Sequence, residues 1–215
     1  MMKLLLPLML FMAAVAMAAC AKDGPETDVI KTSAGDLKIT FIGHASLVFA
    51  HAGKIIHVDP CGTLADYAAL PKADLILITH EHPDHLDKAA MEKIRTKDTE
   101  IVASEAASKA LGDGIAMKNG DVKTVKGFRI EAVPAYNLVN KRPDGNPFHP
   151  KGAGNGYVIV FGATRVYVAG DTENIPEMKA LAGVDVAFIP MNLPYTMTPE
   201  MAASAARMLA PGILY

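Results

Sequence analysis

The sequence is poor in cysteine and has almost no excess of charge. Its 215 residues include 2 Cys, and 21 Lys+Arg stand against 23 Asp+Glu, which gives a formal net charge of −2. Two cysteines exclude a disulfide framework. The missing basic excess excludes a general polyanion-binding surface, so we expect no nucleic-acid partner. With 51% hydrophobic residues and no internal repeat, the sequence is typical of a single globular domain.

The one long apolar run lies at the N-terminus. Lys3 is the only charge ahead of an apolar stretch in residues 4–16, and small residues lead to Cys20. This pattern predicts a secretory signal peptide over residues 1–19. The spacing before Cys20 resembles a bacterial lipobox, so we expect a lipid anchor on Cys20, which would be the protein's contact with the membrane. The triplet of residues 16–18 would also suit an ordinary signal peptidase, which leaves a soluble secreted product.

Either form predicts an exported bacterial protein, periplasmic or anchored to the membrane as a lipoprotein. Residues 20–36 are polar and predict a tether between membrane and domain. A lipidated Cys20 would leave Cys61 without a partner, which excludes a structural disulfide.

From residue 37 the chain predicts short strands with helices interleaved later. This alternation predicts an α/β domain of packed sheets with helices outside, over residues 37–215. The long segment 137–155 has no internal pattern, and loops of that length are usually functional or disordered. Strands are expected at residues 37–43, 46–50, 54–60, 74–80, 100–104, 115–118, 121–126, 128–133, 157–163, 165–171, 185–190 and 212–215, and helices at 87–97, 103–111, 176–182 and 198–209.

Residues 79–87 carry the clearest chemical signal. His80, His82, Asp84 and His85 fall within six positions, directly after an apolar strand. Imidazole nitrogens and a carboxylate are the ligands that Zn²⁺ takes in proteins. The plain alternative is a surface loop with solvated histidines. Four potential ligands in six positions favour a metal site.

The His80-x-His82-x-Asp84-His85 pattern resembles the signature of the metallo-β-lactamase superfamily. Residues 43–46, 58–60 and 169–172 also fall in the order found in the branch with L-ascorbate-6-phosphate lactonase-like and N-acylphosphatidylethanolamine phospholipase D-like hydrolases. The resemblance covers residues 37–215. It implies an αββα sandwich, in which two mixed β-sheets are flanked by helices and the metal site lies at the sheet edges.

The resemblance also implies a ligand set for two metal ions, with Zn²⁺ expected and Mn²⁺ or another divalent metal as the alternative. His80 and His82 would bind the first metal, Asp84 and His85 the second, and Asp171 would bridge both. Asp171 follows an apolar strand, as His80 does, although Gly170-Asp171 alone would also suit a turn. Two further residues would support the site without binding metal. Asp59 would brace the ligand loop, and His44 would stand behind the ligands or pack in the core.

Two ligands of the superfamily are missing at their expected places. Where a third histidine for the first metal would stand, the sequence has Tyr136, which would face the substrate, bind metal as a phenolate, or simply pack. His149 on the long loop could replace the missing imidazole, or it could be solvated. The last ligand would follow the final strand, in which the sequence stops at Tyr215. We therefore expect a sandwich without its C-terminal end.

The resemblance implies a hydrolase that uses a metal-bound hydroxide to cleave an ester, lactone or phosphodiester bond of a small molecule. Asp84 would orient the nucleophile and relay its proton. Lys141, Arg142 and Lys151 on the long loop would attract an anionic substrate, or they form a solvated face. The alternative is a non-catalytic metal- or ligand-binding module with a degenerate site. A di-iron oxidoreductase is a third reading, and β-lactamase activity does not fit the flanking motifs.

Overall fold

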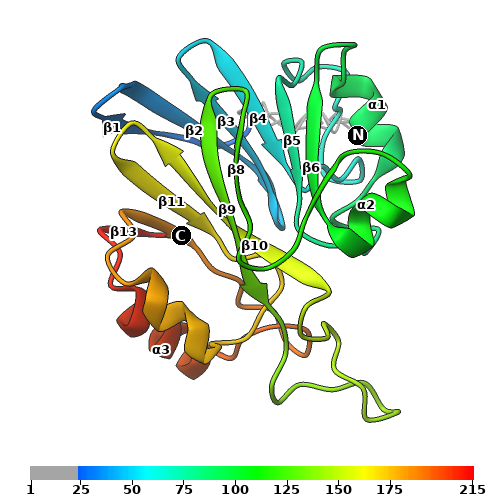
Figure 1. Cartoon of the computed structure of the whole chain (residues 1–215), viewed down its shortest axis with the longest axis vertical. Coiled ribbons are helices and arrows are strands. Elements are labelled where there is room, and N and C mark those ends of the chain that lie inside the picture. The colour runs from blue at the N-terminus through cyan, green and yellow to red at the C-terminus, as the bar shows by residue number, and fades with distance from the viewer. Residues whose placement is uncertain (1–23) are drawn as a thin grey trace, which may run out of the picture.

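The computed structural model describes residues 24–215, whose strands form two mixed β-sheets stacked face to face. Helices cover the outer face of each sheet, and the C-terminus lies beside the second sheet (Figure 1). The layer order is helix, sheet, sheet, helix. The predicted αββα sandwich is therefore confirmed.

The first sheet has seven strands in the order β1-β2-β3-β4-β5-β6-β7. Neighbours from β1 to β4 are antiparallel, and neighbours from β4 to β7 are parallel. The strands are β1 (Thr27–Thr32), β2 (Gly35–Gly43), β3 (Ser46–His51), β4 (Lys54–Val58), β5 (Leu75–Ile78), β6 (Glu100–Ser104) and β7 (Ile115–Met117).

The second sheet has six strands in the order β13-β12-β11-β10-β9-β8. Neighbours from β8 to β11 are antiparallel, and β11, β12 and β13 are parallel. The strands are β8 (Val122–Val125), β9 (Phe128–Ala135), β10 (Gly154–Phe161), β11 (Thr164–Val168), β12 (Val186–Phe188) and β13 (Ile213–Leu214).

Strand β5 shows why the sheets and helices stack in this order. Leu75 and Leu77 point into the core between the two sheets, whereas Ile76 and Ile78 pack under the helices of the first sheet. All four are fully buried, as expected for a parallel strand that is covered on both faces. The helices are α1 (Lys88–Ile94) and α2 (Glu105–Leu111) on the first sheet, and the 3₁₀ helix η1 (Pro176–Leu181) and α3 (Pro199–Leu209) on the second.

Side-chain caps fix where the helices begin. Thr198 caps α3 by accepting a hydrogen bond from the Met201 amide, and Pro199 occupies the first helical position. This start was predicted from the sequence and is confirmed. Ser104 caps α2 in the same way. Asp87 caps α1, directly after the histidine-rich loop.

The polar tether predicted over residues 20–36 is wrong for its second part. Residues 27–32 form the edge strand β1, which pairs with β2 in register from Thr27 opposite Thr40 to Thr32 opposite Gly35. Its side chains are mostly exposed, so an edge strand has the composition of a linker. The predicted signal peptide and Cys20 lie outside the described residues. No helix in the described part of the chain is long and apolar enough to cross a membrane.

Candidate metal centre

The histidine-rich loop leaves the end of β5 and leads into α1. The buried Asp59, after β4, anchors its start, because Asp59 Oδ1 accepts a 2.8 Å hydrogen bond from the Thr79 amide and Oδ2 accepts one of 2.6 Å from the Thr79 hydroxyl. A second anchor comes from the other sheet, where the Asn155 amide donates to the Thr79 carbonyl at 2.9 Å. The loop is thus tied to both sheets at the point where its first histidine, His80, begins.

Two site residues come from the second sheet. His149 lies on the loop between β9 and β10, and Asp171 follows β11 after Gly170. Gly170 has φ +64°, and a Cβ there would lie 3.0 Å from the Asn155 carbonyl oxygen and from Thr79 Cβ. Only glycine permits this close approach. The approach brings Asp171 next to the histidine-rich loop.

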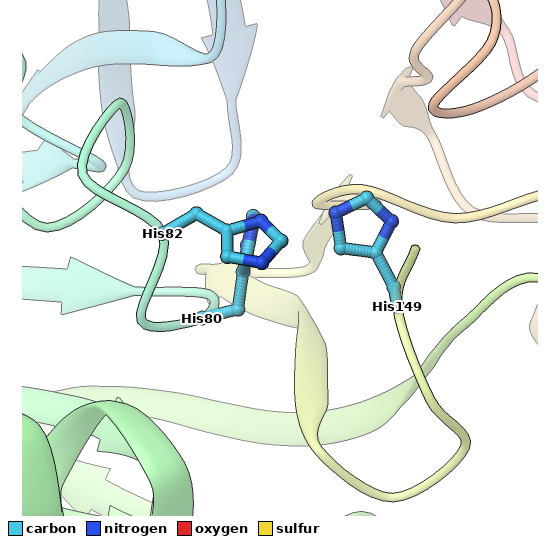
Figure 2. Close-up of side chains that lie close together, drawn as sticks. All are labelled: His80, His82 and His149. Atoms are coloured by element: carbon cyan, nitrogen blue, oxygen red, sulfur yellow. The ribbon is translucent and has the colours of Figure 1, made fainter. Parts of the chain in front are cut away.

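Three imidazoles form the first donor group: His80, His82 and His149 (Figure 2). His80 Nε2 lies 3.1 Å from His82 Nδ1, and the His149 ring centre lies 4.9 Å from that of His80 and 5.0 Å from that of His82. Two nitrogen ligands at 2.0–2.1 Å from a tetrahedral ion stand roughly 3.3 Å apart. The spacing of His80 and His82 therefore suits two ligands of one ion.

The second donor group combines His85 with carboxylates. His85 Nε2 lies 3.5 Å from Asp171 Oδ1 and 3.9 Å from Asp84 Oδ2. Asp84 Oδ2 in turn lies 3.1 Å from Nε2 of His44, which stands at the solvent side. The other oxygen of Asp171, Oδ2, lies 3.4 Å from His149 Nε2. Asp171 therefore stands between the two groups, with one oxygen toward each.

The ring orientations of His80, His85 and His149 are each fixed by a contact at the Nδ1 atom. His85 Nδ1 donates to Asp59 Oδ2 at 2.8 Å, and His149 Nδ1 donates to Asn137 Oδ1 at 2.8 Å. His80 Nδ1 lies 3.0 Å from the Thr79 hydroxyl oxygen, which accepts because its own proton goes to Asp59. These contacts at Nδ1 turn Nε2 of His80, His85 and His149 toward the site, and Nε2 is the nitrogen through which each ring would bind a metal.

The electrostatics of the two groups differ. Burial, together with the neighbouring histidines, holds the pKa of His80 well below its ordinary value. Burial and the nearby His82 likewise lower the pKa of His149 to about 3. Both are therefore neutral imidazoles, which is the form that binds metal. Burial acts against protonation of His85, but Asp59 and Asp171 raise its pKa to about 9, and burial raises the pKa of Asp171 itself.

The residues present fit a divalent metal. His85 Nε2 is fully buried and has no hydrogen-bond partner in the described part of the chain. A buried polar atom without a partner is costly unless something else satisfies it. Imidazole and carboxylate donors are the set that suits Zn²⁺ and similar ions. A cation between these side chains would give His85 Nε2 a partner and would be bound by His80 Nε2 and His82 Nδ1.

Tyr136 does not face this site, which corrects the prediction of a substrate-facing role. Its ring packs under η1 on the outer side of the second sheet, and its hydroxyl donates to Glu177 Oε2 at 3.0 Å. Ala135, the last residue of β9, lines a small pocket together with His80, His82 and His149, and the next side chain, that of Tyr136, points to the opposite face. The ammonium group of Lys151 lies over the Tyr136 ring and bonds Glu177 at 2.7 Å.

Two supporting residues were missed by sequence reasoning. Asn137 directly follows Tyr136, and the buried Glu173 directly follows Asp171-Thr172. Asn137 lies on the loop that carries His149 and contacts His149 itself, and Glu173 contacts the same loop from outside. In the sequence, the one sign of this role was that Glu173 is an acidic residue two positions after Asp171. Its partners are main-chain amides, which leave no pattern in the sequence.

A cavity of about 370 Å³ opens beside the second donor group. Its polar lining residues are His44, Asp171 and Asn192, and the rest of the lining is mainly apolar. None of the residues that line it, all within 24–215, is Lys or Arg. The apolar lining consists of Phe41, Ala45, Leu47, Val168, Phe188, Ile189, Pro190 and Met191, with Gly170 and Tyr215 completing the wall.

Comparisons with known proteins agree with this geometry. The family model described as beta-lactamase superfamily domain matches residues 38–215. A crystal structure of a protein from Parabacteroides distasonis assigned as a metal-dependent hydrolase has a TM-score of 0.85 and 51% identity, covering 89% of this chain and 86% of that one. The metallo hydrolase Igni18 from Ignicoccus hospitalis has a TM-score of 0.68 and 27% identity, covering 83% and 80%.

Curated relatives give the same result. A metal-dependent hydrolase from Thermus thermophilus is 30% identical over 81% of this chain and 80% of its own length. One from Methanopyrus kandleri is 32% identical over 82% and 81%. The fold and the site define a metal-dependent hydrolase. The chain belongs to the beta-lactamase superfamily domain family, and the branch within the superfamily stays a prediction.

Proposed function

We propose that this chain hydrolyses an ester, lactone or phosphodiester bond with two divalent cations, and that both are Zn²⁺. The observation that carries the proposal is the position of Asp171, whose two oxygens face His85 Nε2 and His149 Nε2 at 3.5 and 3.4 Å. A carboxylate between two donor groups is the arrangement that a two-metal hydrolytic site needs.

The chain's own residues would divide between two cation sites. His80, His82 and His149 would hold the first, and His85 with Asp84 the second, while Asp171 would touch both. When bound, the cations supply an activated water and polarise the oxygen of the scissile group. His149 thus takes the place of the imidazole that is missing beside Tyr136.

Asp84 is the residue best placed to receive the proton of the attacking water. Its side chain is 56% exposed, so water reaches it, and its Oδ2 accepts a hydrogen bond from His44 Nε2 at 3.1 Å. Partial burial would raise the pKa of Asp84, but His85 and His44 lower it, so the carboxylate stays ionised. His44 fixes which oxygen faces the site.

The cavity next to Asp171 supports a substrate with an apolar group beside the scissile bond. Its volume of about 370 Å³ is within the usual range for small-molecule sites. None of the three loop cations expected to attract an anion lines this cavity, and two of them have partners on or near the loop: Lys151 pairs with Glu177, and Arg142 lies over the Phe148 ring. An uncharged acyl or alkyl group therefore fits this wall better than a phosphate or carboxylate does.

Metal analysis and a substrate panel test the proposal. We expect two equivalents of Zn²⁺ per chain, and faster turnover of p-nitrophenyl butyrate than of a carboxylate-bearing ester or bis(p-nitrophenyl) phosphate. His149→Ala should retain at most one equivalent and lose at least 100-fold in kcat/KM. Lys151→Ala, on the same loop, is the matched control and should retain both metals.

Three outcomes would contradict the proposal. Full metal loading without turnover of any of the three substrates would favour the non-catalytic binding module. Retention of both metals by His149→Ala would remove His149 from the ligand set. Two equivalents of iron in place of zinc would favour a di-iron oxidoreductase.

We further propose that the protein acts outside the cytoplasm, anchored by a lipid on Cys20. The support is the sequence before that cysteine, in which residues 2–19 run from a charged residue through an apolar stretch to small residues. Labelling cells with a radioactive fatty acid should mark the native protein but not Cys20→Ser. A label that is retained in Cys20→Ser, or absent from both, would contradict the anchor.

A further inference from the structure

The segment that carries His149 has little regular structure of its own. Between β9 and β10 it contains one isolated β-bridge, between Lys141 and Pro147. A metal ligand on such a segment needs to be held by contacts from outside, because the backbone alone does not fix it.

Those contacts begin at Glu173, whose side chain is completely buried. Its Oε2 accepts hydrogen bonds from the amides of Leu138 and Val139, both at 2.8 Å, and its Oε1 accepts one from Asn140 at 2.7 Å. Oε1 also accepts the side-chain amide of Asn137 at 3.2 Å. No cationic side chain in residues 24–215 pairs with Glu173. Four amide donors thus compensate a buried carboxylate, which otherwise would be costly.

Asn137 transmits this anchoring to His149. Its Nδ2 donates to Glu173 and to the Tyr195 carbonyl at 2.8 Å, so Oδ1 must face the other way. Oδ1 accepts the His149 amide at 2.7 Å and the His149 Nδ1 proton at 2.8 Å. The Asn137 amide also donates to the His149 carbonyl at 2.9 Å. One side chain therefore fixes the backbone, the ring orientation and the tautomer of His149.

We infer that Glu173 is a positioning residue that acts through Asn137 to hold His149 as a metal ligand. This inference rests on the proposed function, because it takes His149 as a ligand of the first cation. Glu173 does not touch the cation or the substrate. It orders the first residues of the loop, and Asn137 then presents His149 Nε2 to the site.

Glu173→Gln tests the chain of contacts with little change in shape. Glutamine keeps one acceptor oxygen but turns an NH₂ group toward backbone amides that need acceptors. We expect the affinity of the first site for Zn²⁺ to fall 10–100-fold, the effect usual for residues that support a metal ligand. The visible spectrum of the Co²⁺-loaded protein should also change, because the ligand geometry changes. Glu173→Asp, which keeps the charge, should recover part of the affinity.

Asn137→Ala separates positioning of His149 from mere anchoring of the loop. It removes the two side-chain contacts to His149, keeps the main-chain one, and leaves Glu173 bonded to the three backbone amides. Hydrogen exchange of Leu138, Val139 and Asn140 should therefore stay slow, while the Zn²⁺ affinity falls as in Glu173→Gln. Glu177→Gln is the matched control, since Glu177 pairs with Lys151 and Tyr136 on the outer face. It should bind Zn²⁺ as the wild type does.

The variants also distinguish this inference from the proposed function. If His149→Ala keeps its first metal, the ligand assignment is wrong and the inference falls with it. If His149→Ala loses that metal while Glu173→Gln or Asn137→Ala binds it normally, the positioning role alone is overturned. Should Glu173→Gln fail to fold, Asn137→Ala decides by the same measurement.

Discussion

The imidazole rings of the site depend on single oxygen atoms behind them. Asp59, Thr79 and Asn137 each receive the Nδ1 proton of one histidine, so the opposite nitrogen is free for a metal. The sequence allowed Asp59 to be predicted as a brace because it matches a position of the superfamily. Asn137 could not be found in this way, because nothing in the printed sequence distinguishes it from other loop asparagines.

His57 in β4 gives a prediction for the acid stability of the fold. The side chain is 1% exposed, and its Nε2 donates to the Pro71 carbonyl at 3.0 Å. Burial, only partly offset by that hydrogen bond, lowers the pKa of His57 to about 4 from the ordinary 6.5. Above pH 6.5 the ring is neutral in the folded and unfolded chain. As the pH falls from 6.5 to 4, only the unfolded chain takes up the proton, so stability is lost.

The size of this effect follows from the pKa difference. His57 alone should lower the free energy of unfolding by up to about 3 kcal/mol over that range, and its contribution should level off below pH 4. Urea denaturation of metal-free wild type and His57→Gln between pH 7.5 and 4 measures it. The wild type should lose stability relative to His57→Gln as the pH falls. A difference between the two that does not vary with pH would contradict the assignment.

At the scale of elements, strands with a buried face were predictable and the exposed edge strand was not. β5 is wholly apolar and β2 carries buried Leu37 and Ile39 at alternate positions, so their positions follow from the sequence. β1 buries almost nothing, and its polar sequence was therefore interpreted as a tether. Tyr136 was misplaced because strand alternation determines which face a side chain joins.

The cap of α1 gives a prediction that connects an element to the site. Asp87 Oδ1 accepts the amides of Ala89 and Ala90, and its Oδ2 accepts the Gly62 amide at 2.8 Å. Asp87→Ala should therefore cost about 2 kcal/mol in the free energy of unfolding, because it removes a cap and a tertiary bond. It should also weaken Zn²⁺ binding, since Asp87 ends the histidine-rich loop.

Thr198→Ala is the matched comparison on the second sheet. Thr198 caps α3 through the Met201 amide alone and lies outside the ligand loops. Its loss should cost about 1 kcal/mol and leave the Zn²⁺ affinity as it is. Chemical denaturation and metal titration of both variants provide the test. If Asp87→Ala and Thr198→Ala change the Zn²⁺ affinity equally, Asp87 does not support the site.

For the whole molecule, the candidate ligands come from both sheets. His80 to His85 follow β5 of the first sheet, while His149 and Asp171 belong to loops of the second. All four members of the first set could be proposed from the sequence because they lie within six positions. The place of His149 was left open, because only the packing of one sheet on the other brings that residue to the cluster.

A metal held between the sheets should stabilise the whole fold. A ligand that binds only the folded state at 100 times its Kd adds about 2.7 kcal/mol. We expect Zn²⁺ to raise the melting temperature of the EDTA-treated protein, and EDTA to reverse the increase. His149→Ala should show a smaller increase. Equal increases in wild type and His149→Ala would mean that the metal does not connect the sheets through that residue.

The contiguity of the histidine-rich loop also affects the unfolded chain. His80, His82, Asp84 and His85 stay near one another after unfolding, whereas His149 and Asp171 move away because many residues separate them. Metal binding to the unfolded chain reduces the stabilisation that the same metal gives the folded one. If these residues are the ligands, we expect the four local ones to compete with the complete site at high Zn²⁺ concentrations. Refolding would then begin from chains that already carry a cation, and the docking of the second sheet would bring His149 and Asp171 to it.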